Sequence, residues 1–316
     1  MTRIAVIGAG HFGQNHIRIV NESPDAELVA IIDPDPAKAN AHGIAGFSTL
    51  AELPNIADAV IISAPTIHHA ALGREAMSRG LDVLIEKPLA ATLEEATQLT
   101  EVATRYNRIL QVGHLERYNP AVIALEQAAT TPLFFEIHRM SVFSPRSLDV
   151  DVVLDLMIHD LDIVLALTHS PLEQVQAAGV QILSSKTDIA NVRLQFQDGC
   201  IANLTASRVS TEKVRKLRLF QPHQYLSLDY ARQDLAAFTV GENQQIGFQQ
   251  YVVVKNQPLK AQFAAFLHSI ATRQTPKLDG ETARRTLSLA LDITEKIAEH
   301  AALVARTRLS PSGRPK

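Results

Sequence analysis

The sequence predicts an α/β chain of two domains: a doubly wound parallel sheet, then an α+β domain with a large, mostly antiparallel, open-faced sheet. Three observations support this fold class. Apolar strands alternate with helical segments over the first 115 residues, a glycine-rich turn ends the first strand, and strand follows strand from about residue 172 to 256. The length of 316 residues also fits about two domains.

Five strands are expected in the first domain, residues 1–118. They lie in the runs RIAVIGAG, AELVAIIDPDP, DAVIISAP, LDVLIEKP and RILQVGH, and segments such as FGQNHIRIVNES and TLEEATQLTEVATRY are the helices between them. Because a repeated strand–helix pattern covers both faces of a parallel sheet, we expect helices on each side of these strands.

The second domain is expected at 119–305, with a tail at 306–316. A helix near 121–129, a strand near 133–143 and a helix at 151–168 come first. Seven strands should follow, in VQAAGVQIL, IANVRLQFQDG, CIANLTASRV, VRKLRLFQP, QYLSLDYA, LAAFTV and YVVVK, separated by turn signals typical of antiparallel pairing. Helices near 258–272 and 279–305 close the domain, and the second is a candidate to pack back on the first domain.

The bulk composition argues against several classes of partner. A net charge of -3 gives no electrostatic case for nucleic acid or an anionic membrane, and the basic run at 213–220 alternates like a strand with one solvated face. No apolar run reaches the roughly 18 residues of a membrane span. Cys200 is the single cysteine, and Gly8 and Gly10 interrupt the N-terminal apolar run too early for a signal peptide. A soluble, cytoplasmic protein is therefore expected.

The turn GAGHFG supplies Gly8, Gly10 and Gly13 in a G-x-G-x-x-G frame between a strand and a helix. In a dinucleotide site the first glycine permits the tight turn, the second lets the pyrophosphate approach, and the third lets helix and strand pack closely. The helix N-terminus, with His11 and Phe12 in its first turn, offers N–H groups to the pyrophosphate. A Rossmann-type cofactor site is predicted here, against the alternative of a glycine turn without a ligand.

Asp33 ends the second strand, 20 residues after Gly13. Its carboxylate can accept hydrogen bonds from both ribose hydroxyls and would repel a 2′-phosphate. The residues that follow, 34–36, include no arginine that would tolerate NADP. NAD is therefore the predicted cofactor, and no metal is required.

The run Glu86-Lys87-Pro88 ends a strand at the carboxyl edge of the sheet, where ligands of open α/β folds bind. Pro88 restricts the backbone of Lys87, so a lysine here could be aimed at a substrate hydroxyl and favour its alkoxide. An ordinary surface lysine is the alternative. The next strand ends in VGHLERYNP, which should bring His114 and residues 117–119 to the same edge.

The apolar segment VVLDLMIHDLDIVLAL, residues 152–167, carries four ionisable groups. At about 100° per residue, Asp155, His159 and Asp162 share one face of a helix, whereas Asp160 lies off that face and is expected to be solvated. Buried groups of this kind need partners. The shared face is therefore either a structural network or a reaction site.

Taken in order, GAGHFGQNH, APTIHH, EKPLA, VGHLERYNPAV and VVLDLMIHDLD resemble the Gfo/Idh/MocA family of NAD(P)-dependent sugar and polyol dehydrogenases. The resemblance is specific to about residue 168 and looser to about 305. It implies a Rossmann domain followed by an α/β domain whose open sheet face commonly forms dimers or tetramers, so a homodimer or homotetramer is expected.

The resemblance also assigns roles to residues. It implies that Lys87 or His159 takes the hydroxyl proton and that Asp155 orients the imidazole, with Asp162 in a supporting position. His69, four residues after Pro65, matches the family's histidine near the nicotinamide, and Ala64, Pro65, Glu86 and Lys87 are expected to contact the cofactor. One departure is that many members carry Gly-Gly shortly before the Asp, where this chain has DVDVVLD.

The substrate is inferred from a closer resemblance to the subgroup that oxidises the 3-hydroxyl of UDP-N-acetylglucosamine. In that subgroup the ketone can pass to a partner aminotransferase that forms the 3-amino sugar of lipid A-type glycolipids. The diphosphate of such a substrate needs cations, and guanidinium groups suit it. The candidate substrate-binding residues are Lys87, Arg117, Tyr118, Asn119, Arg139, Arg146 and His159, with Arg208 as a further arginine.

Two other functions remain open at the level of sequence. One is a dehydrogenase of a free polyol or sugar such as myo-inositol, which needs no grip on a diphosphate. The other is an NAD-binding regulator without turnover, against which the presence of Lys87, Asp155 and His159 argues. Fold alone does not separate these alternatives.

Overall fold

The structure is a computed structural model that describes residues 1–143, 150–241 and 243–308. The chain divides into two compact units, residues 1–118 with 256–287, and residues 119–255 with the described residues from 288 on. The first break falls where the sequence places the domain boundary. Residues 256–287, which the sequence assigns to the second domain, belong to the first unit.

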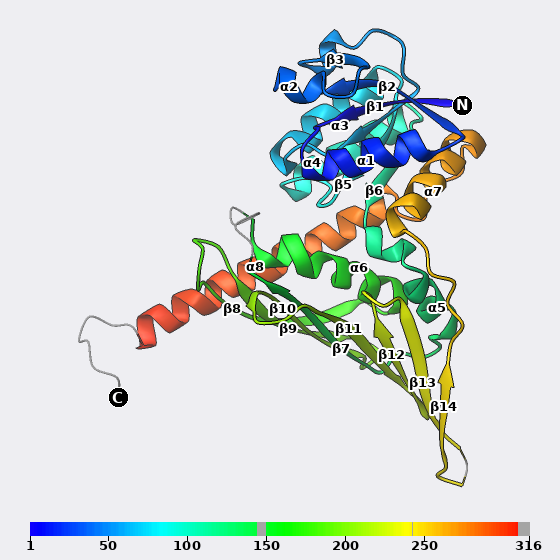
Figure 1. Ribbon diagram of the computed structural model, residues 1–316. Coiled ribbons are helices and arrows are strands. Elements are labelled where there is room, and N and C mark those ends of the chain that lie inside the picture. Colours follow the sequence, from blue (N-terminus) through cyan, green and yellow to red (C-terminus); the bar gives the residue numbers. More distant parts are fainter. Residues whose placement is uncertain (144–149, 242, 309–316) are drawn as a thin grey trace. The chain divides into compact units, whose positions relative to one another are not determined.

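The first unit is built on a six-stranded parallel sheet in the order β3-β2-β1-β4-β5-β6 (Figure 1). This confirms the predicted doubly wound sheet. The strands are β1 (Thr2–Ile7), β2 (Ala26–Ile32), β3 (Ala45–Phe47), β4 (Ala59–Ile62), β5 (Asp82–Glu86) and β6 (Leu110–Gly113). The short edge strand β3 has no apolar run to announce it, so the sequence analysis missed it.

Local signals in the sequence fix the helix ends of this unit. The side chain of Thr92 caps α4 by accepting a hydrogen bond from the N–H of Glu95 at 3.2 Å, and Pro258 opens α7 at a position where no N–H is needed. The helices are α1 (His11–Glu22), α2 (Pro36–Ala39), η1 (Leu50–Glu52), η2 (Thr66–His68), α3 (His69–Ser78), α4 (Leu93–Arg105), η3 (Leu115–Tyr118), α7 (Pro258–Thr272) and the start of α8 (Gly280–Arg308).

The second unit contains an eight-stranded sheet in the order β14-β13-β12-β11-β7-β10-β9-β8. Within this sheet, β7 and β10 are the only described neighbours that pair in parallel, which confirms a mostly antiparallel sheet. The strands are β7 (Phe134–Val142), β8 (Leu172–Val180), β9 (Ile189–Phe196), β10 (Ile201–Ser210), β11 (Val214–Gln221), β12 (Gln224–Asp229), β13 (Asp234–Val240) and β14 (Ile246–Gln250).

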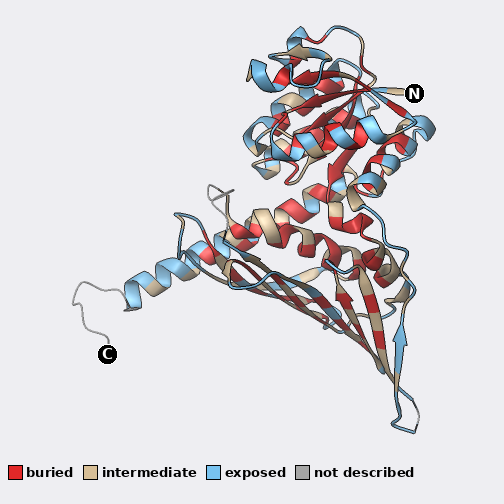
Figure 2. Cartoon of the chain, in the orientation of Figure 1, coloured by how far each residue is buried: buried red, intermediate tan, exposed pale blue. Residues whose placement is uncertain are grey.

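One face of this sheet carries the core of the second unit. The helices α5 (Pro120–Ala128), η4 (Val153–Met157), α6 (Ile158–Leu167) and the later part of α8 pack there against alternate strand residues such as Phe135, Leu217 and Leu226. Figure 2 shows the alternation as buried and less buried residues along the inner strands, such as β9, β11 and β12. The opposite face stays open, as the period-2 pattern predicts.

The predicted strand at 251–255 is wrong, because the last strand is β14, five residues earlier. Tyr251 and Val253 do pack on the core, whereas Val252 and Val254 are 96% and 83% exposed. The run therefore has the alternation of a strand. It lacks a ladder of hydrogen bonds to a neighbour within the described residues, and β-branched side chains alone do not make a strand.

No helix in the described ranges is both long enough and apolar enough to cross a membrane.

Candidate functional site

A pocket of about 850 Å³ opens at the carboxyl ends of β1, β2 and β4 in the first unit. Gly8, Gly10, Asp33, Ala64 and Pro65 line it. The order of strands reverses between β1 and β4, which is the switch point where open α/β sheets bind their ligands. The sequence-predicted cofactor residues of these three strands are therefore gathered around one cavity.

The three glycines of the turn have different environments. Gly8 has a φ of +88°, which favours glycine, and a Cβ added to Gly13 would lie 1.9 Å from the carbonyl oxygen of Gly8. A Cβ added to Gly10 would meet no described atom within 4 Å. The space beside Gly10 is thus open at the N-terminus of α1, where no side chain caps the helix. This fits a pyrophosphate approaching the first-turn N–H groups.

Asp33 is held rigidly at the mouth of the same turn. Its carboxylate accepts hydrogen bonds from the N–H of Ala9 at 2.8 Å and from the N–H of Asp35 at 2.9 Å, and the residue is only 6% exposed. A carboxylate has about four acceptor positions, so it retains capacity for ribose hydroxyls. His11 and Phe12 lie in the first turn of α1 with exposed side chains.

His69 occupies a buried position with a backbone carbonyl oxygen beside each ring nitrogen. Nδ1 lies 2.9 Å from the carbonyl oxygen of Pro88, and Nε2 lies 2.8 Å from that of Ala64. Burial lowers the pKa of this imidazole against the raising effect of the two carbonyls. The ring thus links the ends of β4 and β5, and it acts on the pocket by fixing the Ala64–Pro65 segment.

Glu86 is the last residue of β5 and Lys87 follows it directly, and both are half-buried. The carboxylate of Glu86 lies 2.8 Å from Nε2 of His16 on α1. The peptide bond between Lys87 and Pro88 is cis. Arg117 and Tyr118 of η3 are each 7% exposed, so neither side chain is the open surface group that a substrate contact at the sheet edge would suggest.

Asn119 serves a structural purpose in the second unit. Its side-chain oxygen accepts a hydrogen bond from the N–H of Ala121 at the start of α5, and its amide donates to the carbonyl oxygen of Tyr230 at 3.0 Å. The residue is 2% exposed. The structure therefore does not support the predicted substrate contact for Asn119, since both ends of the amide bind protein atoms.

Asp155 lies in η4, which is a turn of π-helix and not the regular α-helix that the sequence analysis assumed. The i→i+5 bonding of a π turn widens the helix, and such turns are frequent at functional sites. Asp155 and His159 are half-buried, whereas Asp162 is 1% exposed. The α-helical spacing that relates His159 to Asp162 holds from Ile158 onward.

Asp160 is not solvated as expected, because it forms a buried ion pair with Arg139. The two side chains make a bidentate contact at 2.7 and 2.8 Å, and the hydroxyl of Tyr230 donates to the same carboxylate at 3.0 Å. Arg139 is 2% exposed and lies over the Tyr230 ring. The pair of N–H groups that could bind a diphosphate is therefore buried and already bonded to Asp160. The predicted role of Arg139 in substrate binding is not supported.

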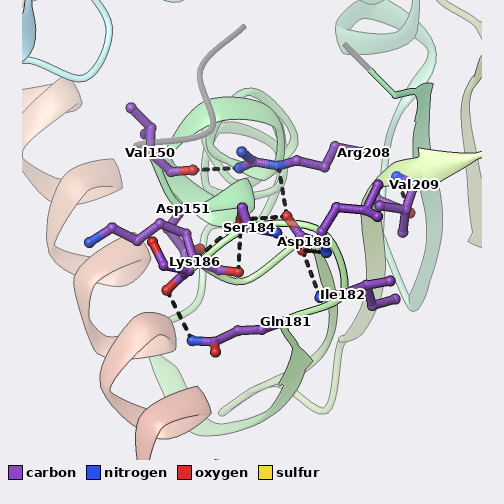
Figure 3. Close-up of polar contacts among 12 residues, drawn as sticks. Val150, Asp151, Gln181, Ile182, Ser184, Lys186, Asp188, Arg208 and Val209 are labelled. Carbon is purple, nitrogen blue, oxygen red and sulfur yellow. Dashed lines mark hydrogen bonds and ion pairs between the residues drawn. The ribbon is translucent and has the colours of Figure 1, made fainter. Parts of the chain in front are cut away.

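Arg208 is likewise committed to the fold (Figure 3). It donates to the carbonyl oxygen of Val150, and its Nε lies 3.8 Å from the carboxylate of Asp188. It therefore ties the loop between β8 and β9 to the segment that enters η4. Arg146, the remaining arginine predicted to bind the diphosphate, lies outside the described residues.

Asp188 is the centre of that loop. Its carboxylate accepts hydrogen bonds from the N–H groups of Ile182, Leu183 and Ser184 at 2.6 to 2.9 Å and from the Ser184 hydroxyl at 2.7 Å. Burial disfavours the ionised form, but these hydrogen bonds outweigh it and hold the pKa of Asp188 well below its usual range. The carboxylate is thus a charged anchor for the loop.

No group of three or more His, Cys, Asp and Glu side chains in the described parts of the chain could hold a metal ion. The residues around the pocket suit a dinucleotide: uncapped helix N–H groups, an open space beside a glycine and a fixed carboxylate.

Comparisons with known proteins agree with this geometry. The Gfo/Idh/MocA family model, described as an oxidoreductase family with an NAD-binding Rossmann fold, matches residues 2–114, and the family's C-terminal domain model matches residues 133–221. The chain is 35% identical to UDP-N-acetylglucosamine 3-dehydrogenase of Acidithiobacillus ferrooxidans over 301 residues, which cover 92% of this chain and 96% of that relative. The chain belongs to the Gfo/Idh/MocA family. It is an NAD-dependent oxidoreductase.

A solved structure of that enzyme and one further relative define the range of similarity. A solved structure of the Acidithiobacillus ferrooxidans enzyme has a TM-score of 0.88 at 34% identity and covers 95% of this chain and 98% of its own. The scyllo-inositol 2-dehydrogenase (NAD(+)) of Bacillus subtilis is 29% identical over 233 residues, or 66% of this chain and 68% of that enzyme. The likeness to the nucleotide-sugar enzyme is thus both higher and longer.

Sequence reasoning missed His16, which is fully buried and reaches Glu86. The signal was its position three residues after Gly13, which places it one turn into the helix on the same side as the glycine that packs on the sheet.

Alanine at the two glycines of the turn should separate folding from cofactor binding. Gly13→Ala should lower the thermal unfolding midpoint, because its Cβ meets the Gly8 carbonyl oxygen. Gly10→Ala should leave unfolding unchanged yet weaken NAD at least about tenfold, since the methyl group fills the pyrophosphate approach. Unfolding scans and titration calorimetry with NAD measure both effects. Equal NAD affinity in Gly10→Ala would contradict this account.

Asp188→Asn should lower the free energy of unfolding at pH 7 by about 2 kcal/mol, because the neutral amide loses the charge that strengthens the three N–H hydrogen bonds and its NH2 group cannot accept from the Ser184 hydroxyl. The folded pKa of Asp188 lies below its unfolded value of about 3.9, so the stabilisation is present above pH 4 or so and disappears as pH falls. The difference in the free energy of unfolding between wild type and Asp188→Asn, measured by urea unfolding, should therefore become smaller as the pH falls from 7 to 3.5. The exposed Asp198→Asn is the control, and a difference independent of pH would refute the charge argument.

Proposed function

We propose that the chain oxidises the 3-hydroxyl of UDP-N-acetylglucosamine to a ketone. The observation that carries this proposal is the 35% identity to the Acidithiobacillus ferrooxidans UDP-N-acetylglucosamine 3-dehydrogenase along nearly the whole of both chains. The structure supports it with a pocket suited to NAD in the first unit and with a helix in the second unit that carries half-buried Asp155 and His159.

The reaction divides between cofactor and protein. NAD supplies the hydride acceptor for the carbinol carbon. The protein must remove the hydroxyl proton, and we assign that step to Lys87 or His159, with Asp155 orienting the imidazole. A histidine has a pKa close to neutral pH, which suits a general base. The C–H electron pair leaves as hydride, the O–H proton goes to the base, and a C=O bond forms.

The cofactor contacts that we propose are those of the pocket and its rim. Gly8, Gly10 and Gly13 shape the turn, the first-turn N–H groups at His11 and Phe12 receive the pyrophosphate, and Asp33 receives the ribose. Ala64, Pro65, Glu86 and Lys87 contribute at the ends of β4 and β5, where His69 keeps its positioning role. For the substrate we retain Lys87, Arg146 and His159, since Arg117 and Tyr118 are buried in η3.

The product would serve a transamination. A 3-keto sugar nucleotide is the substrate that an aminotransferase needs to form a 3-amino sugar, and we propose that such an enzyme acts next, in a lipid A-type pathway in the cytoplasm. Removal of the ketone by this partner would draw an unfavourable oxidation forward.

We also propose that the protein is a homodimer or homotetramer formed through the open face of the eight-stranded sheet. Five aromatic rings form a continuous row across β7, β11, β12, β13 and β14 on that face, with neighbouring centroids 4.8 to 5.7 Å apart. They are Phe134, Phe220, Tyr225, Phe238 and Phe248. Phe248 is 63% exposed and the other four rings are half-buried. A partly exposed apolar row of this kind favours burial against another protein surface.

A dehydrogenase of a free polyol is the second candidate, because the Bacillus subtilis scyllo-inositol 2-dehydrogenase is also a relative. Reduced nicotinamide should be followed with NAD and UDP-N-acetylglucosamine, with myo-inositol, and with free N-acetylglucosamine, in the presence of an aminotransferase and an amino donor. Signal with the UDP-sugar alone supports the first proposal, and oxidation of the polyol alone replaces it. Silence with all three, despite NAD binding, would contradict both substrates.

His159→Ala should reduce kcat by about 10²–10⁴ while the dissociation constant of NAD stays unchanged, because the imidazole acts on the hydroxyl proton and not on the cofactor. Steady-state kinetics and titration calorimetry test this. The matched control is His169→Ala, an exposed histidine just beyond α6, which should retain activity. A full-activity His159→Ala would remove this residue from the mechanism.

Phe248→Asp should shift the oligomer toward a smaller species, since it places a charge at the most exposed ring of the aromatic row. Light scattering after size-exclusion chromatography gives the mass. An unchanged mass in this variant and in Tyr225→Asp would place the interface elsewhere.

A further inference from the structure

A buried contact joins the helix of the glycine-rich turn to the residue before Lys87. Nε2 of His16 lies 2.8 Å from Oε1 of Glu86. The His16 side chain is fully buried and that of Glu86 is 12% exposed. Because an ionised carboxylate only accepts hydrogen bonds, Nε2 must carry the proton.

Glu86 is ionised in this setting. Burial alone would raise its pKa, but the hydrogen bond from His16 and the charges of His16 and Lys87 outweigh burial and lower the pKa. Nδ1 of His16 has no hydrogen-bond partner within the described structure. Within the described structure the imidazole therefore makes a single polar contact, which is the one with Glu86.

The carboxylate is confined from its other side as well. Glu86 pairs in register with Gly113 of β6, and a Cβ added to Gly113 would lie 2.8 Å from Oε2. The N–H of Lys87 is 3.3 Å from the same oxygen. Three elements, α1, β5 and β6, thus enclose one carboxylate whose second oxygen accepts from the backbone N–H of Lys87.

We propose that His16 is a positioning residue that acts through Glu86 on Lys87. The imidazole fixes the rotamer of Glu86, and the fixed carboxylate holds the Lys87 backbone and sets a negative charge beside the lysine ammonium. This inference rests on the proposed role of Lys87 in the reaction. The competing account is that the contact only ties α1 to β5.

Two substitutions separate these accounts. His16→Gln keeps an N–H donor near the place of Nε2, whereas His16→Leu removes the donor at similar volume. We expect His16→Leu to lower kcat at least tenfold with NAD affinity and KM changed less than twofold, and His16→Gln to recover most of kcat. His268→Leu, at an exposed histidine on α7, is the control. The proposal would be overturned if His16→Leu kept full activity. It would also be overturned if His16→Leu and His16→Gln both lost kcat and NAD affinity to the same extent.

A double substitution tests the route through Glu86. Glu86→Gln removes the charge but keeps an oxygen that can accept from His16, and it should also lower kcat. If His16 acts only through Glu86, the pair His16→Leu with Glu86→Gln should lose no more than the worse single variant. Losses that multiply would show that His16 acts independently of Glu86.

A readout without turnover distinguishes this inference from the proposed function. Reductive ¹³C-methylation labels the lysines, and Lys87→Arg assigns the Lys87 resonance in the full-length protein. That resonance should move and sharpen in His16→Leu and stay in place in His16→Gln. If the resonance shifts in this way but the wild-type protein oxidises none of the sugars, the positioning role of His16 stands and the proposed substrate is rejected. An identical resonance in wild type and His16→Leu would reject the positioning role, whatever the substrate.

Discussion

The close approach of α1 to β1 at Gly13 is the constraint on which the first unit depends. Because a Cβ at this residue would lie 1.9 Å from the Gly8 carbonyl oxygen, the helix can pack this near the strand only with glycine. That approach aims the uncapped N-terminus of α1 at the pocket. It also sets the rotation of the helix, and therefore delivers His16 to Glu86 one turn later. Cofactor site and Lys87 environment follow from one backbone contact.

Buried charge governs the second unit in a comparable way. Transferring an ionised side chain into a protein interior is costly unless a partner and hydrogen bonds compensate. Asp160 pairs with Arg139, and Asp188 collects backbone N–H groups while Arg208 lies beside it. The Arg208 network reaches Val150 just before η4, and Asp160 lies in the first turn of α6. These networks hold Asp155 and His159 on a rigid element, which a proton-transfer site requires.

The predictions from sequence were most accurate where the residues concerned are close together in the chain. The glycine frame, Asp33 and the strand alternation predicted the parallel sheet and its pocket, since each rests on neighbouring residues. The predictions were weakest where partners are far apart in the chain. Arg139 and Arg208 were candidates for binding the diphosphate because their partners are distant in the sequence. Asp160 lies 21 residues after Arg139 and Asp188 lies 20 residues before Arg208, and no periodicity encodes either pairing. The π turn at Asp155 was likewise hidden, because helical spacing assumes a regular helix.

The return of residues 256–287 to the first unit has a consequence for synthesis of the chain. Phe263 and Phe266 of α7 belong to the same core as Ile17 and Val20 of α1, yet they leave the ribosome only after residues 119–255 of the second unit have been made. Domains fold as they emerge, N-terminal part first. The growing chain therefore carries an uncovered apolar face on its first unit for more than a hundred residues of elongation, and during this interval a chaperone would find its binding surface there.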